Sequence, residues 1–178
     1  MIKVVDTPNP DTKKFVFDGV IVGEGSKEFK KKDGSLGFVD NLFDLGNIEL
    51  IFLDKNFISV RKSKNASWEN LAQKVLEILS ENINKDFSPL IFKEENEFTD
   101  EVSIRIEEVL NEKIRPAVAM DGGDIRLKSF KNGVAEVMLK GACAGCPSST
   151  ITLKHGVERM IKHYVPEVTS VEAININE

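Results

Sequence analysis

The spacing of hydrophobic residues divides the chain into two halves that carry different patterns. Over residues 1–65, short apolar runs broken by glycines, such as KKFVFDGVIVGEG, predict strands joined by turns. The segment GFVDNLFDLGNI has apolar residues near helical spacing and predicts a short helix that stops at Gly46. The segment NIELIFLDKNFISVRKS that follows predicts a β-hairpin.

From Ser67 onward the hydrophobic period changes from that of a strand to that of a helix. Apolar residues recur at i, i+3, i+4 and i+7 as far as Ile83, which predicts an amphipathic helix. Ser67 is the expected N-cap, and Glu69 is favourable in the first turn. The polar segment 84–97 contains Pro89 and a group of glutamates, and we expect it to be a linker.

The remaining residues predict the element order α, β, β, α, β. The first helix is expected to have Thr99 as its cap and to end near Pro116. The segment MDGGD predicts a turn into a strand, and two alternating runs around KNG predict a hairpin. Pro147 suits the first position of the next helix, and EVTSVEAI predicts a final strand.

Together these patterns predict an α/β (α+β) protein of two small domains, over residues 1–86 and 98–178, joined by the linker 84–97. Among 178 residues, 41% are hydrophobic and 30% are charged, which provides enough apolar material for two cores. The net charge of −5 gives no electrostatic reason to expect a nucleic-acid partner. No apolar run approaches the roughly 20 residues of a membrane span, so we expect no membrane partner either.

The N-terminal sequence and the cysteine usage bear on the cellular compartment. The opening MIKVVDTPNP lacks the apolar region of a secretory signal and the arginine-rich pattern of a transit peptide. We therefore expect a cytoplasmic protein, or a protein of the mitochondrial matrix if a transit peptide has been removed. The two cysteines, Cys143 and Cys146, form a single CxxC motif, which in a reducing compartment is typically redox-active or metal-binding.

Both cysteines lie in GACAGCPSST, between a predicted strand and a predicted helix. A helix N-terminus carries partial positive charge and unpaired N–H groups. Both favour a thiolate, which is the form that binds a metal or attacks a disulfide. The neighbouring residues are small, so the backbone can approach a bulky inorganic group closely: Gly141, Ala142, Ala144 and Gly145.

Four interpretations of the CxxC motif are open. The first treats both cysteines as small core residues. The second is a zinc site, which needs four ligands, whereas the chain adds only His155 and His163, eight residues apart on the predicted helix. The third is a redox dithiol of the thioredoxin type, although only 32 residues follow Cys146 and no aromatic residue precedes Cys143. The fourth is an iron–sulfur cluster.

An iron–sulfur cluster, either [4Fe–4S] or [2Fe–2S], usually requires four cysteine thiolates, and one copy of this chain supplies two. A two-fold symmetric dimer supplies four, with the cluster on the axis between the two loops. Such a cluster is released when the protomers separate or when a partner exchanges thiolates with them. Half a ligand set per chain therefore favours a scaffold or carrier over an electron-transfer protein.

The segments MDGGDIRL, GACAGCPSSTITLKHGVERMI and PEVTSVEAI resemble the NifU-like C-terminal domain of iron–sulfur scaffold proteins, over residues 99–176. The opening TPNPDTKKF, with the helix and hairpin after it, resembles the N-terminal Nfu domain. The resemblance implies a non-enzymatic assembly factor that receives a cluster, typically [4Fe–4S], from an upstream donor and delivers it to apo-proteins. It places the metal ligands on Cys143 and Cys146, and it leaves partner recognition to the cysteine-free N-terminal domain.

The remaining chemical features have simpler interpretations. Asp121 and Asp124 flank two glycines and could form a hard-cation site, but a helix-to-strand turn is the commoner use of such a segment. The run KEFKKKDG predicts a solvated loop or a strand edge guarded by lysine. We find no phosphate-binding glycine loop and no nucleophile–base pair in the sequence, so the alternative activity is a dithiol–disulfide oxidoreductase that uses the CxxC pair.

Overall fold

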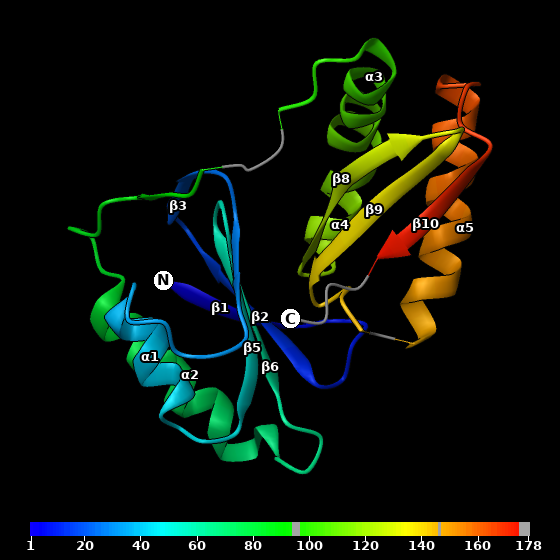
Figure 1. Ribbon diagram of the computed structural model, residues 1–178. Helices are drawn as coiled ribbons and strands as arrows, with labels where there is room; N and C mark the ends of the chain where they lie inside the picture. Colours follow the sequence, from blue (N-terminus) through cyan, green and yellow to red (C-terminus); the bar gives the residue numbers. More distant parts are fainter. Residues whose placement is uncertain (94–96, 146, 175–178) are drawn as a thin grey trace. The chain divides into compact units, whose positions relative to one another are not determined.

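The computed structural model describes residues 1–93, 97–145 and 147–174, with the side chains of 147–150 and 152 excluded. The chain divides into two compact units, Met1–Glu94 and Glu95–Glu178, each with its own sheet and helices (Figure 1). The predicted α+β class is confirmed.

The first unit is built on a five-stranded antiparallel sheet in the order β1-β2-β6-β5-β4. The predicted hairpin is confirmed, because β5 and β6 pair with each other around Lys55 and Asn56. The lysine run begins in β4, at one edge of the sheet, where lysine opposes edge-to-edge association. The strands are β1 (Ile2–Asp6), β2 (Thr12–Phe17), β4 (Lys27–Phe29), β5 (Ile48–Asp54) and β6 (Phe57–Lys62).

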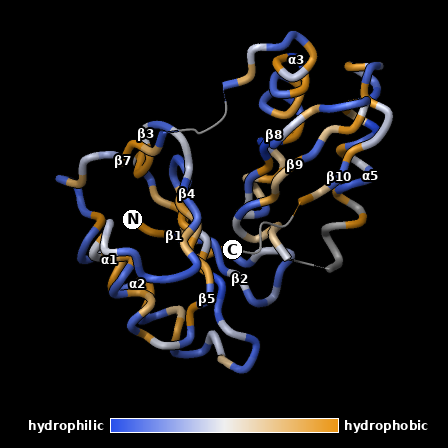
Figure 2. Tube along the Cα trace, viewed as in Figure 1, coloured by the Kyte–Doolittle hydropathy of each residue, from blue (hydrophilic) through white to orange (hydrophobic). Residues whose placement is uncertain are grey.

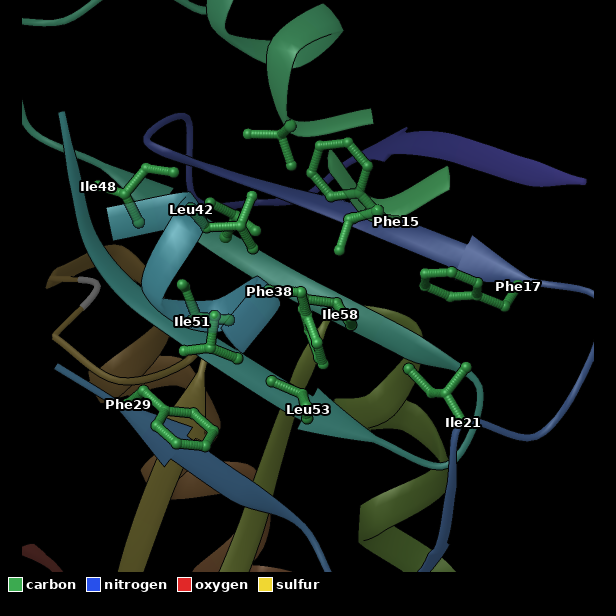
Figure 3. Close-up of a cluster of buried hydrophobic side chains, with 14 of the residues drawn as sticks. Phe15, Phe17, Ile21, Phe29, Phe38, Leu42, Ile48, Ile51, Leu53 and Ile58 are labelled. Atoms are coloured by element: carbon green, nitrogen blue, oxygen red, sulfur yellow. The ribbon is translucent and has the colours of Figure 1, made fainter. Parts of the chain in front are cut away.

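Two helices, α1 (Gly37–Phe43) and α2 (Trp68–Asn82), pack with this sheet around one hydrophobic core. The hydroxyl of Ser67 accepts a hydrogen bond from the backbone N–H of Glu69 at 3.2 Å, so the predicted N-cap is confirmed. Figure 3 shows aromatic and aliphatic side chains of the strands meeting those of α1. The fully buried members of this core include Phe15, Val39, Leu42, Ile51, Leu53, Ile58, Val60, Val75 and Leu79.

Part of the segment 84–97, which we expected to be a linker, is an element of the first unit. The short strand β7 (Leu90–Ile91) pairs in parallel with β3 (Val22–Glu24). The linker prediction was wrong over these residues because a two-residue strand leaves no periodic pattern, and its partner lies far back in the sequence. Three side chains of the segment pack against the first core: Phe87, Leu90 and Phe92.

The second unit has a three-stranded sheet in the order β10-β9-β8. Strands β8 (Gly123–Lys131) and β9 (Val134–Gly141) form the predicted antiparallel hairpin, and β10 (Ser170–Ile174) runs parallel to β9. The hairpin turns at Asn132 and Gly133, whose φ angles of 51° and 80° are the pair of positive values that a type I′ turn requires.

The first helix of the second unit, α3 (Glu101–Val109), begins one residue later than predicted. A carboxylate oxygen of Asp100 accepts a hydrogen bond from the Ser103 N–H at 2.8 Å, so Asp100 and not Thr99 is the N-cap. Aspartate and threonine are both good caps, and the sequence alone did not decide between neighbours. This hydrogen bond from the Ser103 N–H stabilises the carboxylate and lowers the pKa of Asp100.

The helical segment also extends beyond its predicted end. After α3 the chain forms a π-helical turn, Leu110–Ile114, and then α4 (Arg115–Met120). We call Leu110–Ile114 the π turn. The helix passes Pro116 because a proline is tolerated in the first turn of a helix, where its missing N–H is not needed. A helix end near Pro116 was therefore a wrong prediction.

Both edge strands of the second sheet receive a carboxylate from a helix. Glu107 of α3 accepts the backbone N–H of Leu127 in β8 at 2.8 Å, and Glu158 of α5 (Pro147–Tyr164) accepts that of Val171 in β10 at 3.0 Å. Unpaired N–H groups at a sheet edge promote association, so these bonds protect both edges. A hydrogen bond from Lys162 and the bond from Val171 lower the pKa of the Glu158 carboxyl.

The helices of this unit pack with the sheet around a second core. Along β9, every second residue is buried, which places one face of the sheet against the helices. Figure 2 shows hydrophobic residues recurring between hydrophilic ones along α5. Within the described residues, no helix combines the length and hydrophobicity that crossing a bilayer requires. Buried members of the second core include Ile106, Leu110, Ile125, Leu127, Val137, Ile161, Val165 and Val171.

Candidate functional site

Cys143 lies just beyond the end of β9 and contributes its side chain to the second core. The residue as a whole is 5% exposed. Helix α5 begins at Pro147, as predicted, so the cysteine loop connects a central strand directly to a helix N-terminus. Cys146, the second predicted ligand, lies outside the described residues.

The loop around Cys143 is a tight turn of small residues. The N–H of Ala144 donates a hydrogen bond to the carbonyl oxygen of Gly141 at 3.2 Å, which closes the turn around the cysteine. Gly145 has a φ of 68°, a conformation that residues with a side chain rarely adopt. The backbone between the two cysteines therefore depends on glycine at position 145, and the other residue between them, Ala144, carries only a methyl group.

The turn that precedes β8 lies directly against the cysteine loop. The carbonyl oxygen of Gly122 accepts a hydrogen bond from the N–H of Ala142 at 3.1 Å, and Gly123 is the register partner of Gly141. A Cβ atom added at Gly123 would lie 2.6 Å from the sulfur of Cys143, closer than real contacts allow. Glycine is required at position 123 because the sulfur occupies the space where a side chain would begin.

Asp124 follows this turn and is 2% exposed. Its two carboxylate oxygens accept hydrogen bonds from Arg115, at 2.7 Å from Nε and 3.1 Å from Nη2. The Nε atom of Arg126 is 3.3 Å from the second of these oxygens. The charge of the carboxylate is thus balanced by two guanidinium groups. Asp124 follows the helix-to-strand turn that the sequence predicted at MDGGD.

These charges form a small polar network beside the cysteine loop, which we call the Arg115 network. Nη1 of Arg115 donates to the side-chain oxygen of Asn111 at 2.6 Å, and Nη1 of Arg126 is 4.0 Å from Oε2 of Glu107. This network has no signal in the sequence, because an arginine nine residues before an aspartate is not a recognisable motif. The members of the network are Glu107, Asn111, Arg115, Asp124 and Arg126.

The histidines are not brought into a metal site within the described residues. His155 and His163 both lie on α5, and the ring of His163 packs edge-to-face on Tyr164 with centroids 4.8 Å apart. Among the side chains that the structure describes, no group of three or more His, Cys, Asp or Glu residues is placed to hold a metal ion. The zinc alternative therefore gains no support from either histidine.

The fold and the site together define a class of protein. A cysteine-free α+β unit is joined to a smaller α+β unit that presents a CxxC loop between a strand and a helix. Profiles of two protein families match these units in the same order. The family described as "Scaffold protein Nfu/NifU N terminal" matches residues 2–86, and the family described as "NifU-like domain" matches residues 106–172.

Relatives match almost the whole chain. The NifU-like protein C1709.19c of Schizosaccharomyces pombe is 32% identical over 185 residues, which cover 96% of this chain and 71% of that protein. The chain belongs to the Nfu/NifU-like family of scaffold proteins, as the resemblance of its motifs implied.

Further relatives carry names that include a function. The "NFU1 iron-sulfur cluster scaffold homolog, mitochondrial" of Drosophila persimilis is 33% identical over 97% of this chain, and the chain spans 64% of that protein's length. The protein of the same name from Drosophila grimshawi is 34% identical, over 97% of this chain and 61% of that protein. A solved NifU-like protein of Saccharomyces cerevisiae matches with a TM-score of 0.45 and 22% identity, over 53% of this chain and 86% of that one.

Proposed function

We propose that this chain is an iron–sulfur cluster scaffold and carrier rather than an enzyme. In this proposal Cys143 and Cys146 bind a [4Fe–4S] cluster, which the protein passes to apo-proteins. Family membership and the names of the relatives support the proposal. The observation that carries it is the position of Cys143, buried in a tight loop of small residues that leads through Cys146 into α5.

The ligand count determines how the cluster is held. One chain contributes two thiolates, while a [4Fe–4S] or [2Fe–2S] cluster is held by four. A second copy, related by a two-fold axis, supplies the other two from the same loop. The cluster is therefore shared between protomers, and the loaded form is a dimer.

Sharing the cluster also explains how it is transferred. Each protomer holds the cluster by two iron–sulfur bonds, and thiolates of an apo-protein replace these bonds one at a time. Each exchange swaps one thiolate for another, so no oxidant or reductant is needed. Loading from an upstream donor runs through the same exchange in reverse.

The first unit contains no cysteine and cannot supply a thiolate ligand. We assign to it the recognition of partners, either the cluster donor or the apo-proteins that receive the cluster. Thiolates and a labile cluster require a reducing compartment, so the cytoplasm and the mitochondrial matrix both suit the protein. The Drosophila relatives are named mitochondrial.

Anaerobic reconstitution with iron and sulfide tests the cluster proposal. We expect a brown protein with about four iron and four sulfide per two chains and a dimeric mass in solution. Cys143→Ala and Cys146→Ala should each abolish the visible absorbance, because either change leaves the dimer two thiolates short. Far-UV circular dichroism of the two variants, compared with the unchanged chain, checks that the fold is intact.

Other outcomes point to the alternative classes. A colourless protein that reduces insulin disulfides would support a dithiol–disulfide oxidoreductase. Zinc retained through purification at about one per chain would support a zinc-stabilised interaction module. A monomeric loaded form whose cluster survives the loss of both cysteines would contradict the proposal outright.

A further inference from the structure

We propose that Arg115 and Asp124 form a positioning pair, which holds the Gly122–Gly123 turn against Cys143 and so fixes the thiol for cluster binding. The link to the cluster rests on the proposed function. The positioning itself is a property of the chain without a cluster, and it can be tested separately.

The ion pair between Arg115 and Asp124 has a bidentate geometry. Two nitrogens of Arg115 donate to the two oxygens of Asp124, at 2.7 and 3.1 Å, so the guanidinium holds the carboxylate through a fork of two bonds. The side chain of Asp124 is 2% exposed and that of Arg115 is 23% exposed. A buried bidentate pair fixes both orientation and distance, whereas a pair in water does not.

The Gly122–Gly123 turn connects this pair to the sulfur. Asp124 directly follows Gly123, whose missing side chain leaves the space that the sulfur of Cys143 fills. The preceding Gly122 accepts the N–H of Ala142, the residue before the cysteine. A movement of Asp124 therefore displaces the backbone of Gly123, which lies against the sulfur. It also disturbs the hydrogen bond from the Ala142 N–H to Gly122, which anchors the loop.

The π turn explains why Arg115 reaches Asp124. In a regular α-helix, residues eight positions apart, such as Glu107 and Arg115, are rotated by about 80° about the axis. The π turn between them adds one residue to a turn, which removes about 100° and leaves a difference of about 20°. Both side chains then face β8, where Glu107 accepts the N–H of Leu127 and Arg115 binds Asp124.

The pair of Arg115 and Asp124 resembles the residues around a metal site that orient the metal ligands without binding the metal. Groups that orient metal ligands without touching the metal typically change metal affinity by about 10- to 100-fold when they are removed. Here the orientation is transmitted through the backbone of Gly122 and Gly123 rather than through a bond to the sulfur. Arg115 and Asp124 are accordingly positioning residues and not ligands.

The test uses the full-length chain and four variants. Arg115→Met removes the fork, and Arg115→Lys keeps the charge with a single donor group. The double variant Arg115→Met/Asp124→Leu replaces both members of the pair, because Arg115→Met alone deprives the buried carboxylate of two hydrogen bonds and leaves it beside Nε of Arg126, at 3.3 Å. Arg105→Met is the matched control, since it breaks a more exposed ion pair with Glu167 in the same unit.

The first measurement needs no cluster. With Cys146 changed to serine in every chain, we measure the rate at which Cys143 reacts with iodoacetamide. We expect Arg115→Met and the double variant to react about tenfold faster or more, because loss of the ion pair lowers the free energy of the local opening that exposes the buried thiol, and tenfold corresponds to about 1.4 kcal/mol. Arg115→Lys should lie between them and the unchanged chain, and Arg105→Met should react at the unchanged rate.

The second measurement uses reconstituted chains that retain both cysteines. We expect the time for a chelator to remove half of the iron to shorten by about 10- to 100-fold in Arg115→Met and in the double variant. The visible circular dichroism of the cluster should also change, whereas that of Arg105→Met should not.

Two outcomes overturn the inference. One is a double variant that folds and whose Cys143 reacts no faster than in Arg105→Met. The other is a faster reaction that Arg105→Met shows equally. If no chain takes up a cluster but the reaction rates follow the expected order, the proposed function fails and the positioning role stands. If Arg115→Met does not fold, the double variant and Arg115→Lys decide the question.

Discussion

A single missing methyl group shapes the site at the residue scale. The sulfur of Cys143 lies 2.6 Å from the position that a Cβ of residue 123 would take, and the carbonyl oxygen of Lys140 is 2.8 Å from that same position. Neither neighbour can move freely, because one belongs to the backbone of β9 and the other to the tight loop. The absence of a side chain at Gly123 is thus a condition for the observed position of the Cys143 sulfur.

We predict that Gly123→Ala damages both stability and cluster binding. The added methyl group must displace the loop or distort β9, which should cost about 1–3 kcal/mol in the free energy of unfolding. Urea unfolding measures that loss, and the iron content after reconstitution measures the effect on the site. We expect less bound iron even at urea concentrations where the variant remains folded.

Gly156→Ala is the matched control for this prediction. Gly156 lies within α5, and a Cβ there would meet nothing within 4 Å. Alanine favours a helix over glycine by about 1 kcal/mol, so this variant should be slightly more stable than the unchanged chain. Equal effects of the two substitutions would show that the sulfur contact has no special importance.

The sequence could predict the candidate ligands but not their surroundings. Cys143 and Cys146 stand out because their chemistry and spacing are local properties. The need for glycine at 123 and the pairing of Arg115 with Asp124 depend on contacts made only when the helix and β8 come together. Spacing along the chain carries no signal for such contacts.

At the scale of elements, features determined by adjacent residues were mostly predicted correctly, and two features determined by tertiary contacts were not. The cap of α2 at Ser67 and the Asn132–Gly133 turn were predictable because each is determined by a few adjacent residues. The strand β7 exists only through its pairing with β3, and the π turn lies in a helix whose extent packing decides. The wrong predictions at β7 and at Pro116 concern elements whose extent depends on tertiary contacts, whereas the one-residue error at the start of α3 arose between two adjacent residues that are both good caps.

We predict that Glu158 makes the second unit sensitive to acid. Its pKa is lowered in the folded state by the hydrogen bonds from Lys162 and from the Val171 N–H. A lowered folded pKa contributes stability above the ordinary glutamate value of about 4.3, and that stability is lost as the pH falls through the folded value. The contribution should stay below about 1 kcal/mol, since both side chains are partly exposed and screened by water.

Unfolding curves between pH 7 and pH 3 measure this effect. Glu158→Gln keeps an oxygen that can accept the Val171 N–H but cannot ionise, so its stability should fall less steeply in acid. Glu172→Gln on the exposed side of β10 is the control and should follow the unchanged chain. An identical acid dependence in Glu158→Gln and the unchanged chain would refute the assignment.

At the scale of the whole molecule, the chain consists of two compact units. Each has its own hydrophobic core, and the described residues of one core do not recur in the other. Both cysteines belong to the second unit, and the first unit has none. A chain built this way can separate holding a cluster from choosing the protein that receives it.

We predict that the two units keep these roles when the connection between them is cut. Replacing residues 94–96 by a protease site allows the folded chain to be cleaved after purification. The fragment 97–178 should then take up the cluster and dimerise, because it retains the cysteine loop, its core and the Arg115 network. The fragment 1–93 should stay colourless and folded, with a separate unfolding transition.

Transfer of the cluster to an apo-protein should slow after cleavage if the first unit recognises that partner. The control is a chain without the protease site, incubated with the same protease. A cluster that is lost from a folded fragment 97–178 would show instead that the first unit contributes to cluster binding, and a fragment that unfolds would show that the second unit depends on the first for its stability.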